Sequence, residues 1–399
     1  MKTRKAIEMT KSIWTSLGVA VFVFFLLEVS FSLAFRTKDN FFGSATAYVD
    51  PRENADAYED RTWVASYYRE FARSQVAQWR PYVYWRQQPF EGEYINISKS
   101  GFRVTPSPLP LENGSSPPIR IYMFGGSTLW GTGARDSRTI PAIVATRLAE
   151  KGVSAEVTNL GESGYVSTQE VIELLVQLQA EKSPDFVVFY DGVNDTFSAY
   201  QQGVAGIPQN EFNRIREFNL SGAANRQRLW SIGLGNSFQD LSTVRFLRGL
   251  SRRIGVMERD IVMHSSITLS DEQVDVLARD VVVKHERNMQ MAHALGGQFG
   301  FKVLSYWQPT IFQKPHLTEY ERSWFDFARP MQAFFMRTYA FAQAAKAGQQ
   351  VGSGHGDLSP IFSGSKAPLY VDWCHLAERG NDIIATRMAN DILLHLYGK

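Results

Sequence analysis

The feature that most constrains the fold is an alternation of short apolar runs with helical patterns after residue 118. Strand-like runs occur at 119–124, 155–160, 185–190, 302–307 and 369–372. Helical patterns cover 139–151, 167–181, 272–295 and 377–396. The run at 185–190 is almost continuously apolar, which is typical of a strand buried on both faces. Strands separated by helices predict a doubly wound, parallel α/β sheet.

The composition supports a large packed core and excludes several classes of function. Hydrophobic residues make up 44% of the 399 residues and aromatic residues 13%. The net charge of +2, from 42 basic and 40 acidic residues, gives no strong field for nucleic acid. Neither a zinc-spaced cysteine and histidine cluster nor a phosphate-binding P-loop is present, so we predict no metal and no cofactor. The single cysteine, Cys374, excludes an intramolecular disulfide.

An apolar segment near the N-terminus predicts a membrane anchor. Ile13–Phe35 is 23 residues long, and as a helix of about 34 Å it could cross a bilayer core. Four basic residues precede it and only two follow closely, which places the N-terminus in the cytoplasm. We expect an uncleaved, single-pass anchor in the cytoplasmic (inner) membrane, with the main domain on the periplasmic or extracytoplasmic side. A cleaved signal peptide is the alternative, although the small-x-small site at 45–47 lies ten residues beyond the apolar run.

Glu28 interrupts this apolar segment. An ionisable group within a membrane span costs about 2–3 kcal/mol and usually faces a partner or water. Two interpretations remain open. Glu28 contacts another membrane protein, or it marks the edge of a shorter span.

The rest of the chain divides by composition. Residues 1–12 are expected in the cytoplasm, 13–35 form the anchor, 36–118 form a linker and an aromatic-rich segment, and 119–399 form the main domain. The aromatic residues and arginines of 61–100 suit a sugar-binding platform, but we favour packing against the main domain. An insertion around 197–260 is a possible lid. Its cluster of four arginines could bind an anionic surface, but a solvated helix face is the favoured interpretation.

Polar or glycine-rich residues follow the predicted strands. Ligands bind at the carboxyl ends of the strands in an open parallel sheet, so residues at these positions are informative. We expect four of these blocks to converge on one crevice: Gly125-Gly126-Ser127, Asn159-Leu-Gly-Glu-Ser-Gly164, Gly192-Val-Asn194-Asp195 and Asp372-Trp-Cys-His375.

The residue types in these blocks predict acyl transfer. A serine hydroxyl is a weak nucleophile until a base takes its proton, and His375 could do this for Ser127. Asp372 could hold the imidazole and stabilise its protonated form. The backbone N–H groups of Ser127 and Gly164 and the side-chain amide of Asn194 are candidate oxyanion donors. Each residue alone is more often a turn or cap residue, but the combination favours a catalytic site.

Other candidates receive weaker assignments. Cys374 is a possible thiol nucleophile, but a serine already fills that role. His355 and Asp357 are interpreted as a loop anchor, with a substrate-facing wall as the alternative. Asp191 and Asp195 are expected to bond backbone amides rather than a metal.

The four blocks resemble those of the SGNH/GDSL hydrolase superfamily, and the resemblance covers roughly 119–399. It implies a flavodoxin-like sheet, Ser127 as nucleophile, His375 as base and Asp372 as the residue that orients it. It also implies Gly164 and Asn194 as oxyanion donors. One departure is visible, because the Gly-Asp-Ser of the family is Gly-Gly-Ser here. The missing aspartate is not the triad acid, but its loss removes a local hydrogen-bonding group.

The sequence therefore predicts a membrane-anchored serine esterase that removes an acyl group, most plausibly acetyl, from a carbohydrate or similar ester. The blocks look similar to those of membrane-anchored bacterial members linked to surface polysaccharide. An O-acyltransferase with the same residues is the first alternative, because a sugar hydroxyl could replace water in the second step. The second alternative is an inactive membrane-assembly partner that acts through the anchor, Glu28 and the aromatic segment.

Overall fold

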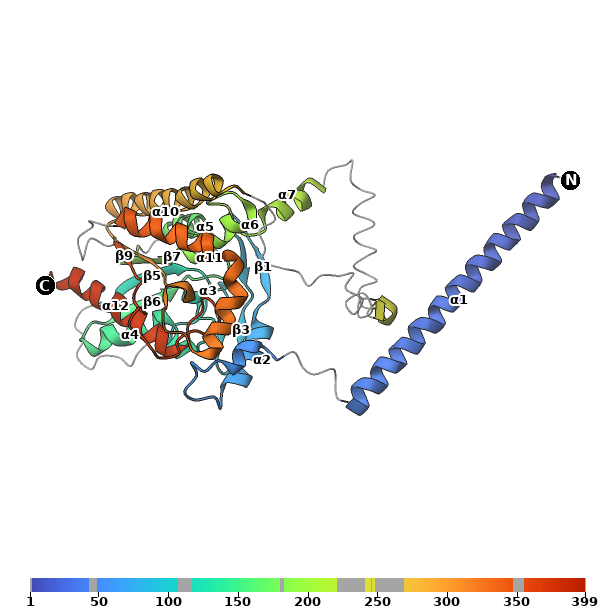
Figure 1. Ribbon diagram of the computed structural model, residues 1–399, viewed down its shortest axis with the longest axis horizontal. Helices are drawn as coiled ribbons and strands as arrows, with labels where there is room; N and C mark the ends of the chain where they lie inside the picture. Colours follow the sequence, from blue (N-terminus) through green and yellow to red (C-terminus); the bar gives the residue numbers. More distant parts are fainter. Residues whose placement is uncertain are drawn as a thin grey trace. The chain divides into compact units, whose positions relative to one another are not determined.

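A five-stranded parallel sheet lies at the centre of the C-terminal part of the chain (Figure 1). The computed structural model describes residues 2–42, 49–106, 117–179, 183–220, 241–244, 246–247, 269–346 and 355–398. The sheet order is β6-β5-β7-β8-β9, with β5 at Ile119–Gly125, β6 at Ala155–Asn159, β7 at Phe186–Asp191, β8 at Lys302–Trp307 and β9 at His355–Asp357. In chain order this is 2-1-3-4-5, the flavodoxin-like arrangement whose switch point lies between β5 and β7. The predicted doubly wound sheet is confirmed.

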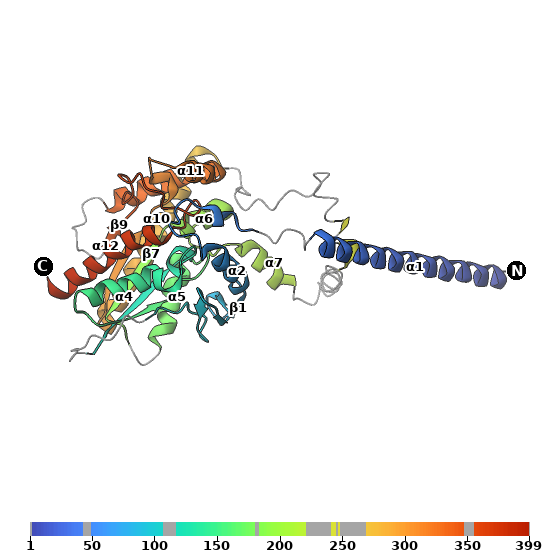
Figure 2. The same ribbon diagram turned by 90° about the horizontal axis from the view of Figure 1, so that it is seen from below.

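Both faces of the sheet are covered by helices, as Figures 1 and 2 show. All six residues of β7 are buried, as its apolar sequence predicts. Phe124 and Phe189 pack with α5 and α10 in one core, while Met123 and Val188 pack with α4 and α12 in another. These helices are α4 (Ile140–Glu150), α5 (Ser167–Leu178), α10 (Asp271–Phe299) and α12 (Glu378–Tyr397).

The chain also contains shorter helical elements, and one long helix was not predicted. The shorter elements are α3 (Ser127–Trp130), η2 (Asp136–Arg138), α6 (Val193–Gln202), α7 (Glu211–Leu220) and η4 (Ile311–Gln313). The unpredicted helix, α11 (Glu319–Lys346), contains Pro330 and packs along α10. A proline inside a helix lacks an N–H donor, which weakens the helical pattern in the sequence.

The prediction of a strand at 369–372 is wrong. The fifth strand is instead β9, which pairs in parallel with β8 through Ser305–Trp307. The backbone N–H groups of Leu369 and Tyr370 both donate to Glu321 Oε1, at 2.9 and 3.2 Å. The N–H of Val371 donates to the His375 carbonyl, which closes a turn. These amides therefore have no capacity to join the sheet.

The segment before the sheet packs on it through aromatic residues. It contains η1 (Pro51–Asn54), α2 (Val64–Ser74) and two antiparallel pairs, β1 (Ala77–Arg80) with β2 (Tyr84–Gln87) and β3 (Phe90–Glu91) with β4 (Asn96–Ile97). Trp63, Tyr67 and Tyr68 are buried in a cluster that also includes Trp130 and Val371. Trp79 and Tyr82, in contrast, are 71% and 77% exposed. The segment thus combines a packed part with an exposed hairpin.

The chain divides into two units, and the apolar N-terminal helix belongs to the one that contains residues 1–49 and 212–262. Helix α1 (Lys2–Phe42) includes Lys11–Thr37, a stretch of mean hydropathy 2.3 that is long enough to cross a membrane. This helix is consistent with either a signal anchor or a signal peptide. Within this unit, Glu28 accepts hydrogen bonds from the backbone N–H groups of Ser242 (2.6 Å) and Thr243 (2.9 Å). The membrane-protein partner expected at Glu28 stays a prediction.

Most of the predicted insertion lies outside the described residues. Residues 221–240, 245 and 248–268 are not described, so the arginine cluster and the possible lid at 197–260 stay predictions.

Candidate active site

Ser127 lies immediately after β5, at the switch point of the sheet. It is the first residue of α3, and the short helix ends at Gly131, whose φ of +105° is a left-handed conformation that favours glycine. The N–H of the first residue of a helix has no partner within the helix. The turn therefore presents both the hydroxyl and the N–H of Ser127 at the carboxyl ends of the strands.

A continuous line of hydrogen bonds joins Ser127 to His375 and Asp372. The Ser127 Oγ lies 2.7 Å from His375 Nε2, and His375 Nδ1 lies 2.6 Å from Asp372 Oδ2. The other carboxylate oxygen, Asp372 Oδ1, accepts the backbone N–H groups of Cys374 (3.0 Å) and His375 (2.8 Å). The structure thus brings the three predicted residues together in the order that allows proton transfer from a hydroxyl to an imidazole.

The surroundings keep Asp372 ionised. Burial disfavours the carboxylate, but His375, its hydrogen bond, Arg52 and the Cys374 amide together outweigh burial and hold the pKa of Asp372 well below its usual range. The neighbouring Cys374 has the opposite balance. Burial and the adjacent Asp372 raise the pKa of its thiol well above the usual value. A neutral, buried thiol is a poor nucleophile, so the site favours serine over Cys374.

Asn194, the first of the predicted oxyanion donors, lies beside Ser127. It follows β7 in the first turn of α6, and its Nδ2 donates to the Tyr165 carbonyl at 2.8 Å. Its Oδ1 accepts from Gln209 Nε2 at 3.5 Å. These bonds fix the amide orientation and leave one Nδ2 hydrogen for another acceptor. The Asn194 amide fills the space that a β-carbon at Gly126 would need.

Gly164 has the left-handed conformation that its position requires. Its φ is +78°. A β-carbon at this position would lie 3.3 Å from Gln209 Oε1 and 3.6 Å from Trp85 Cζ2. The indole N–H of Trp85 donates to the carbonyl of the preceding residue, Ser163, at 3.0 Å. Gly164 and Asn194 therefore share Gln209 as a neighbour, and the hairpin residue Trp85 borders the Gly164 loop.

A cluster of buried polar side chains lies next to the loops that carry Gly164 and Asn194. Asp195 accepts the Ser167 hydroxyl at 2.6 Å, and Asn288 donates to the same hydroxyl oxygen at 2.8 Å. Asp191 Oδ2 lies 3.5 Å from His285 Nε2, and both side chains are buried. Asp195 bonds the Ser167 backbone amide, as predicted, whereas among the described residues the Asp191 carboxylate faces His285 and not a backbone amide. His285 and Asn288 were missed, because a single histidine or asparagine on an amphipathic helix carries no distinguishing pattern.

The contacts of three arginines with the catalytic blocks were not predicted, although packing of the segment 61–100, which includes Arg86, against the main domain was. Arg52, Arg86 and Arg103 come from the segment before the sheet, and Arg86 and Arg103 are each 1% exposed. Only the rarity of buried arginine among aromatic residues could have suggested them, and burial is not visible in the sequence.

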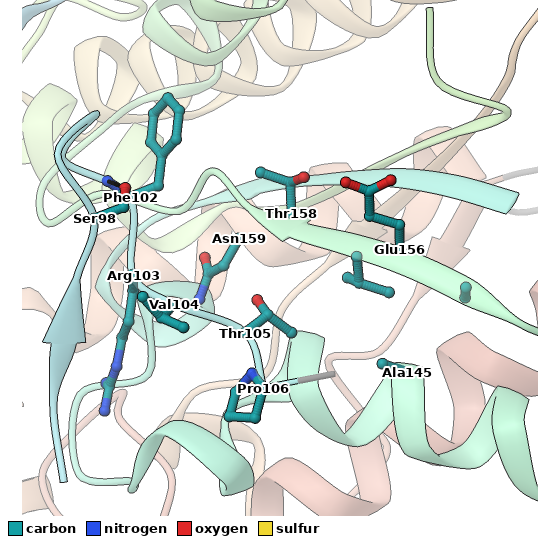
Figure 3. Close-up of a pocket in the computed structure, with 12 residues that line it drawn as sticks. Ser98, Phe102, Arg103, Val104, Thr105, Pro106, Ala145, Glu156, Thr158 and Asn159 are labelled. Carbon is teal, nitrogen blue, oxygen red and sulfur yellow. Dashed lines mark hydrogen bonds between the residues drawn. The ribbon is translucent and has the colours of Figure 1, made fainter. Parts of the chain in front are cut away.

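A cavity of about 320 Å³ lies at the edge strand β6 (Figure 3). It is lined by Ser98, residues 102–106, Ala145 and residues 155–159. The Ser127, Asp372 and His375 side chains do not line it, so it is separate from the hydrogen-bonded line described above.

A family model described as "GDSL-like Lipase/Acylhydrolase" matches residues 121–388. No curated protein matches the sequence significantly. Similar solved structures include an acetyl xylan esterase (15% identity, 69% of this chain and 100% of that chain, TM-score 0.37). They also include a lipolytic protein of the G-D-S-L family from Veillonella parvula (13%, 70% and 99%, TM-score 0.36). A third is an acetyl xylan esterase variant from Geobacillus stearothermophilus (14%, 69% and 94%, TM-score 0.31).

Proposed function

Because this chain belongs to the GDSL-like lipase/acylhydrolase family of ester-bond hydrolases, we propose that Ser127 is its nucleophile, His375 its general base and Asp372 the residue that orients the base. The observation that carries this proposal is the line of hydrogen bonds of 2.7 and 2.6 Å through His375. His375 takes the Ser127 proton while the hydroxyl oxygen attacks the ester carbonyl. The protonated imidazole then gives that proton to the leaving alcohol, and water releases the acyl group in the same way.

The developing negative charge on the carbonyl oxygen requires donors. We assign this role to the N–H groups of Ser127 and Gly164 and to Asn194 Nδ2. The bond from Nδ2 to the Tyr165 carbonyl supports the assignment, since it holds the amide in place before substrate binds. Donors that are fixed in advance need no reorganisation during the reaction.

We further propose that the substrate is a carbohydrate ester and that the acyl group is short, acetyl first of all. The support is the exposed hairpin beside Gly164. Neighbouring aromatic rings lead from the hairpin to Gly164. The ring centroids are 5.6 Å apart between Trp79 and Tyr84 and 6.5 Å apart between Tyr84 and Trp85. The centroid of Trp85 lies 5.4 Å from that of Tyr165, which adjoins Gly164. Flat rings with a polar edge suit the faces of sugar rings, which are apolar with hydroxyl groups at their rim.

The backbone of the hairpin supports the same proposal. Tyr82 and Tyr84 have φ values of +70° and +74°, which are left-handed conformations that cost a non-glycine residue about 1–2 kcal/mol. Strained residues of this kind are concentrated at functional sites. We propose that the strain is retained because it presents the tyrosine rings beside the active site.

The location follows from the N-terminal helix. We propose an uncleaved, single-pass anchor with the catalytic unit on the periplasmic side. The basic residues before Ile13 support this orientation. Fractionation of cells that express the full chain tests the anchor, since release into the soluble fraction contradicts it.

Activity is tested with the full-length protein in detergent, using aryl acetate, longer aryl esters and an acetylated oligosaccharide. The wild type is expected to hydrolyse the acetates and to be labelled by a fluorophosphonate. Ser127→Ala is expected to lose both, whereas Ser363→Ala, at an exposed position, keeps them. Labelling that persists in Ser127→Ala contradicts the proposal. Hydrolysis that accelerates with acyl capture when polysaccharide is added identifies an acyltransferase instead.

A further inference from the structure

Three arginines from the segment 50–105 each contact a different catalytic block. This segment lies outside residues 121–388, which the family model matches. Arg103 contacts the loop after Ser127, Arg86 contacts the loop before Gly164, and Arg52 contacts Asp372. These three arginines therefore reach three of the four catalytic blocks.

Arg103 and Arg86 hold backbone carbonyls of two of these loops. Arg103 Nη1 donates to the Gly131 carbonyl at 2.7 Å, and its Nη2 donates to the Ala134 carbonyl at 2.7 Å. Arg86 Nη1 donates to the carbonyls of Leu160 (3.0 Å) and Gly161 (3.2 Å). A buried guanidinium that binds several carbonyls fixes the path of a loop, because each lost bond leaves a buried polar group unpaired.

Arg52 contacts the Asp372 carboxylate rather than the backbone of a loop. Its Nη1 lies 3.6 Å from Asp372 Oδ2, the same oxygen that binds His375 Nδ1. Its Nε and Nη2 bind Asp50 through two bonds of 2.9 and 2.7 Å. The guanidinium also lies over the rings of Tyr68 (5.2 Å) and Phe71 (5.0 Å). These contacts fix the cation beside Asp372 Oδ2.

Burial raises the pKa of the neighbouring Tyr68 well above its usual value, raises the pKa of Tyr320 to about 12, and raises the pKa of the Cys374 thiol. Glu53, which lies near Asp50, has its pKa raised by burial. The charged groups that carry the argument are Asp372, Arg52 beside it, and Asp50, which is paired with Arg52.

We propose that the segment 50–105 is part of the catalytic machinery and that Arg52 is a positioning residue that sets the charge balance between Asp372 and His375. The proposal rests on the proposed roles of these two residues as acid and base. A cation beside Asp372 offsets part of the carboxylate charge, so protonated His375 is less favoured. Removing this cation is therefore expected to move the acid limb of the pH dependence of activity to higher pH.

The test is the acid limb of the pH dependence of kcat/KM for aryl acetate, measured with full-length protein in detergent. In Arg52→Met the carboxylate is no longer offset, so the pH of half-maximal activity is expected to rise by about 0.5–1 unit. Arg52→Lys keeps the charge and is expected to keep the wild-type midpoint. Arg287→Met, at an exposed position on α10 outside the segment 50–105, is the matched control and is expected to change nothing.

Asp50→Asn is expected to shift the acid midpoint in the direction opposite to that of Arg52→Met. It removes the carboxylate that compensates Arg52, while the asparagine oxygen can still accept the Arg52 backbone N–H. The acid midpoint is therefore expected to fall below that of the wild type. A purely structural role for Arg52 predicts loss of activity in both variants without shifts in opposite directions.

A second readout does not depend on turnover. The NMR titration of carbon-labelled histidines gives the midpoint for the His375 ring, which is identified by its absence in His375→Gln. If the wild type hydrolyses no ester, the proposed function fails, and this titration still decides the role of Arg52. If Arg52→Met does not fold, the comparison of Asp50→Asn with the wild type decides it. Wild-type midpoints in Arg52→Met and Asp50→Asn overturn the proposal.

Discussion

The side-chain amide of Asn194 occupies the space that a β-carbon at Gly126 would need. A β-carbon built on Gly126 lies well inside contact distance of Asn194 Nδ2. The glycine that departs from the Gly-Asp-Ser of the family therefore has a structural reason in this chain. It lets the proposed oxyanion donor approach the backbone next to Ser127.

We predict that Gly126→Ala lowers kcat for aryl acetate by about 100-fold or more. The added methyl group displaces the Asn194 amide, and loss of one oxyanion donor costs about 10²–10³ in kcat. The melting temperature is expected to change little, since the displaced atom is the end of a side chain. Gly364→Ala, where no atom lies within 4 Å of the added carbon, is the control. Unchanged kcat in Gly126→Ala would remove Asn194 from the proposed mechanism.

A second prediction concerns the exposed hairpin. Trp79→Ala and Tyr82→Gly are expected to raise KM for an acetylated oligosaccharide by about 5- to 10-fold, because each removes one ring from the proposed sugar-binding surface. Glycine is chosen at position 82 because it accepts the φ of +70° without strain, so the fold is not weakened. Steady-state kinetics with oligosaccharide and with aryl acetate measure the effect.

Comparing the KM values of the two substrates distinguishes a lost sugar contact from a distorted active site. Aryl acetate is too small to reach the hairpin rings, so its KM is expected to stay at the wild-type value in both variants. Tyr397→Ala removes another exposed aromatic ring, near the C-terminus, and serves as the control. An equal rise in KM for both substrates indicates a distorted site and contradicts a sugar-binding role.

The sequence predicted the sheet and the candidate site because both depend on local patterns. Apolar runs mark β5 to β8, and a parallel sheet brings the residues after these strands to one edge. Ser127 and Asn194 could therefore be placed together without knowledge of any long-range contact. The Asp372–His375 pair was placed with them through the predicted strand at 369–372, which does not form, although the pair does reach Ser127. Their catalytic roles stay predictions.

The parts that were missed depend on contacts between residues far apart in the chain. The run 369–372 has the composition of a strand, but Glu321 takes its amides, and no local pattern reveals that contact. Arg52 and Asp372 are likewise brought together only by the fold. An arginine in the sequence is an exposed residue by default, so its burial beside a carboxylate is not predictable from composition.

A third prediction concerns the pH dependence of stability. Burial disfavours protonated His285, but the neighbouring Asp191 and Glu286 outweigh burial and raise the pKa of His285 to about 9. A raised pKa in the folded state contributes stability that is complete below the unfolded value of about 6.5 and is lost as the pH rises through about 9. We expect His285→Gln to be less stable than the wild type by about 2–3 kcal/mol at pH 6, with the difference shrinking toward pH 10.

Urea unfolding of the two proteins at several pH values measures this difference. His316→Gln, at an exposed histidine, is expected to follow the wild type throughout. A difference between His285→Gln and the wild type that is the same at pH 6 and pH 10 indicates lost packing against Trp307 rather than a lost charge.

The last prediction concerns Arg103, which binds the loop after Ser127. Arg103→Met leaves Asp136, which accepts from Arg103 Nε at 2.8 Å, buried without its cation, and removes one donor from each of the carbonyls of Gly131 and Ala134. Breaking a buried pair by removing one partner costs about 3–5 kcal/mol. We expect a loss of that size in the free energy of unfolding, measured by urea denaturation.

The double variant Arg103→Met, Asp136→Asn separates charge from packing. It removes the unpaired carboxylate as well, so it is expected to be more stable than Arg103→Met alone, because a neutral amide is cheaper to bury than an isolated charge. If the double variant is no more stable than the single one, Arg103 stabilises the loop through its carbonyl contacts and its stacking on Trp130, at 4.4 Å from the ring centroid, rather than through Asp136.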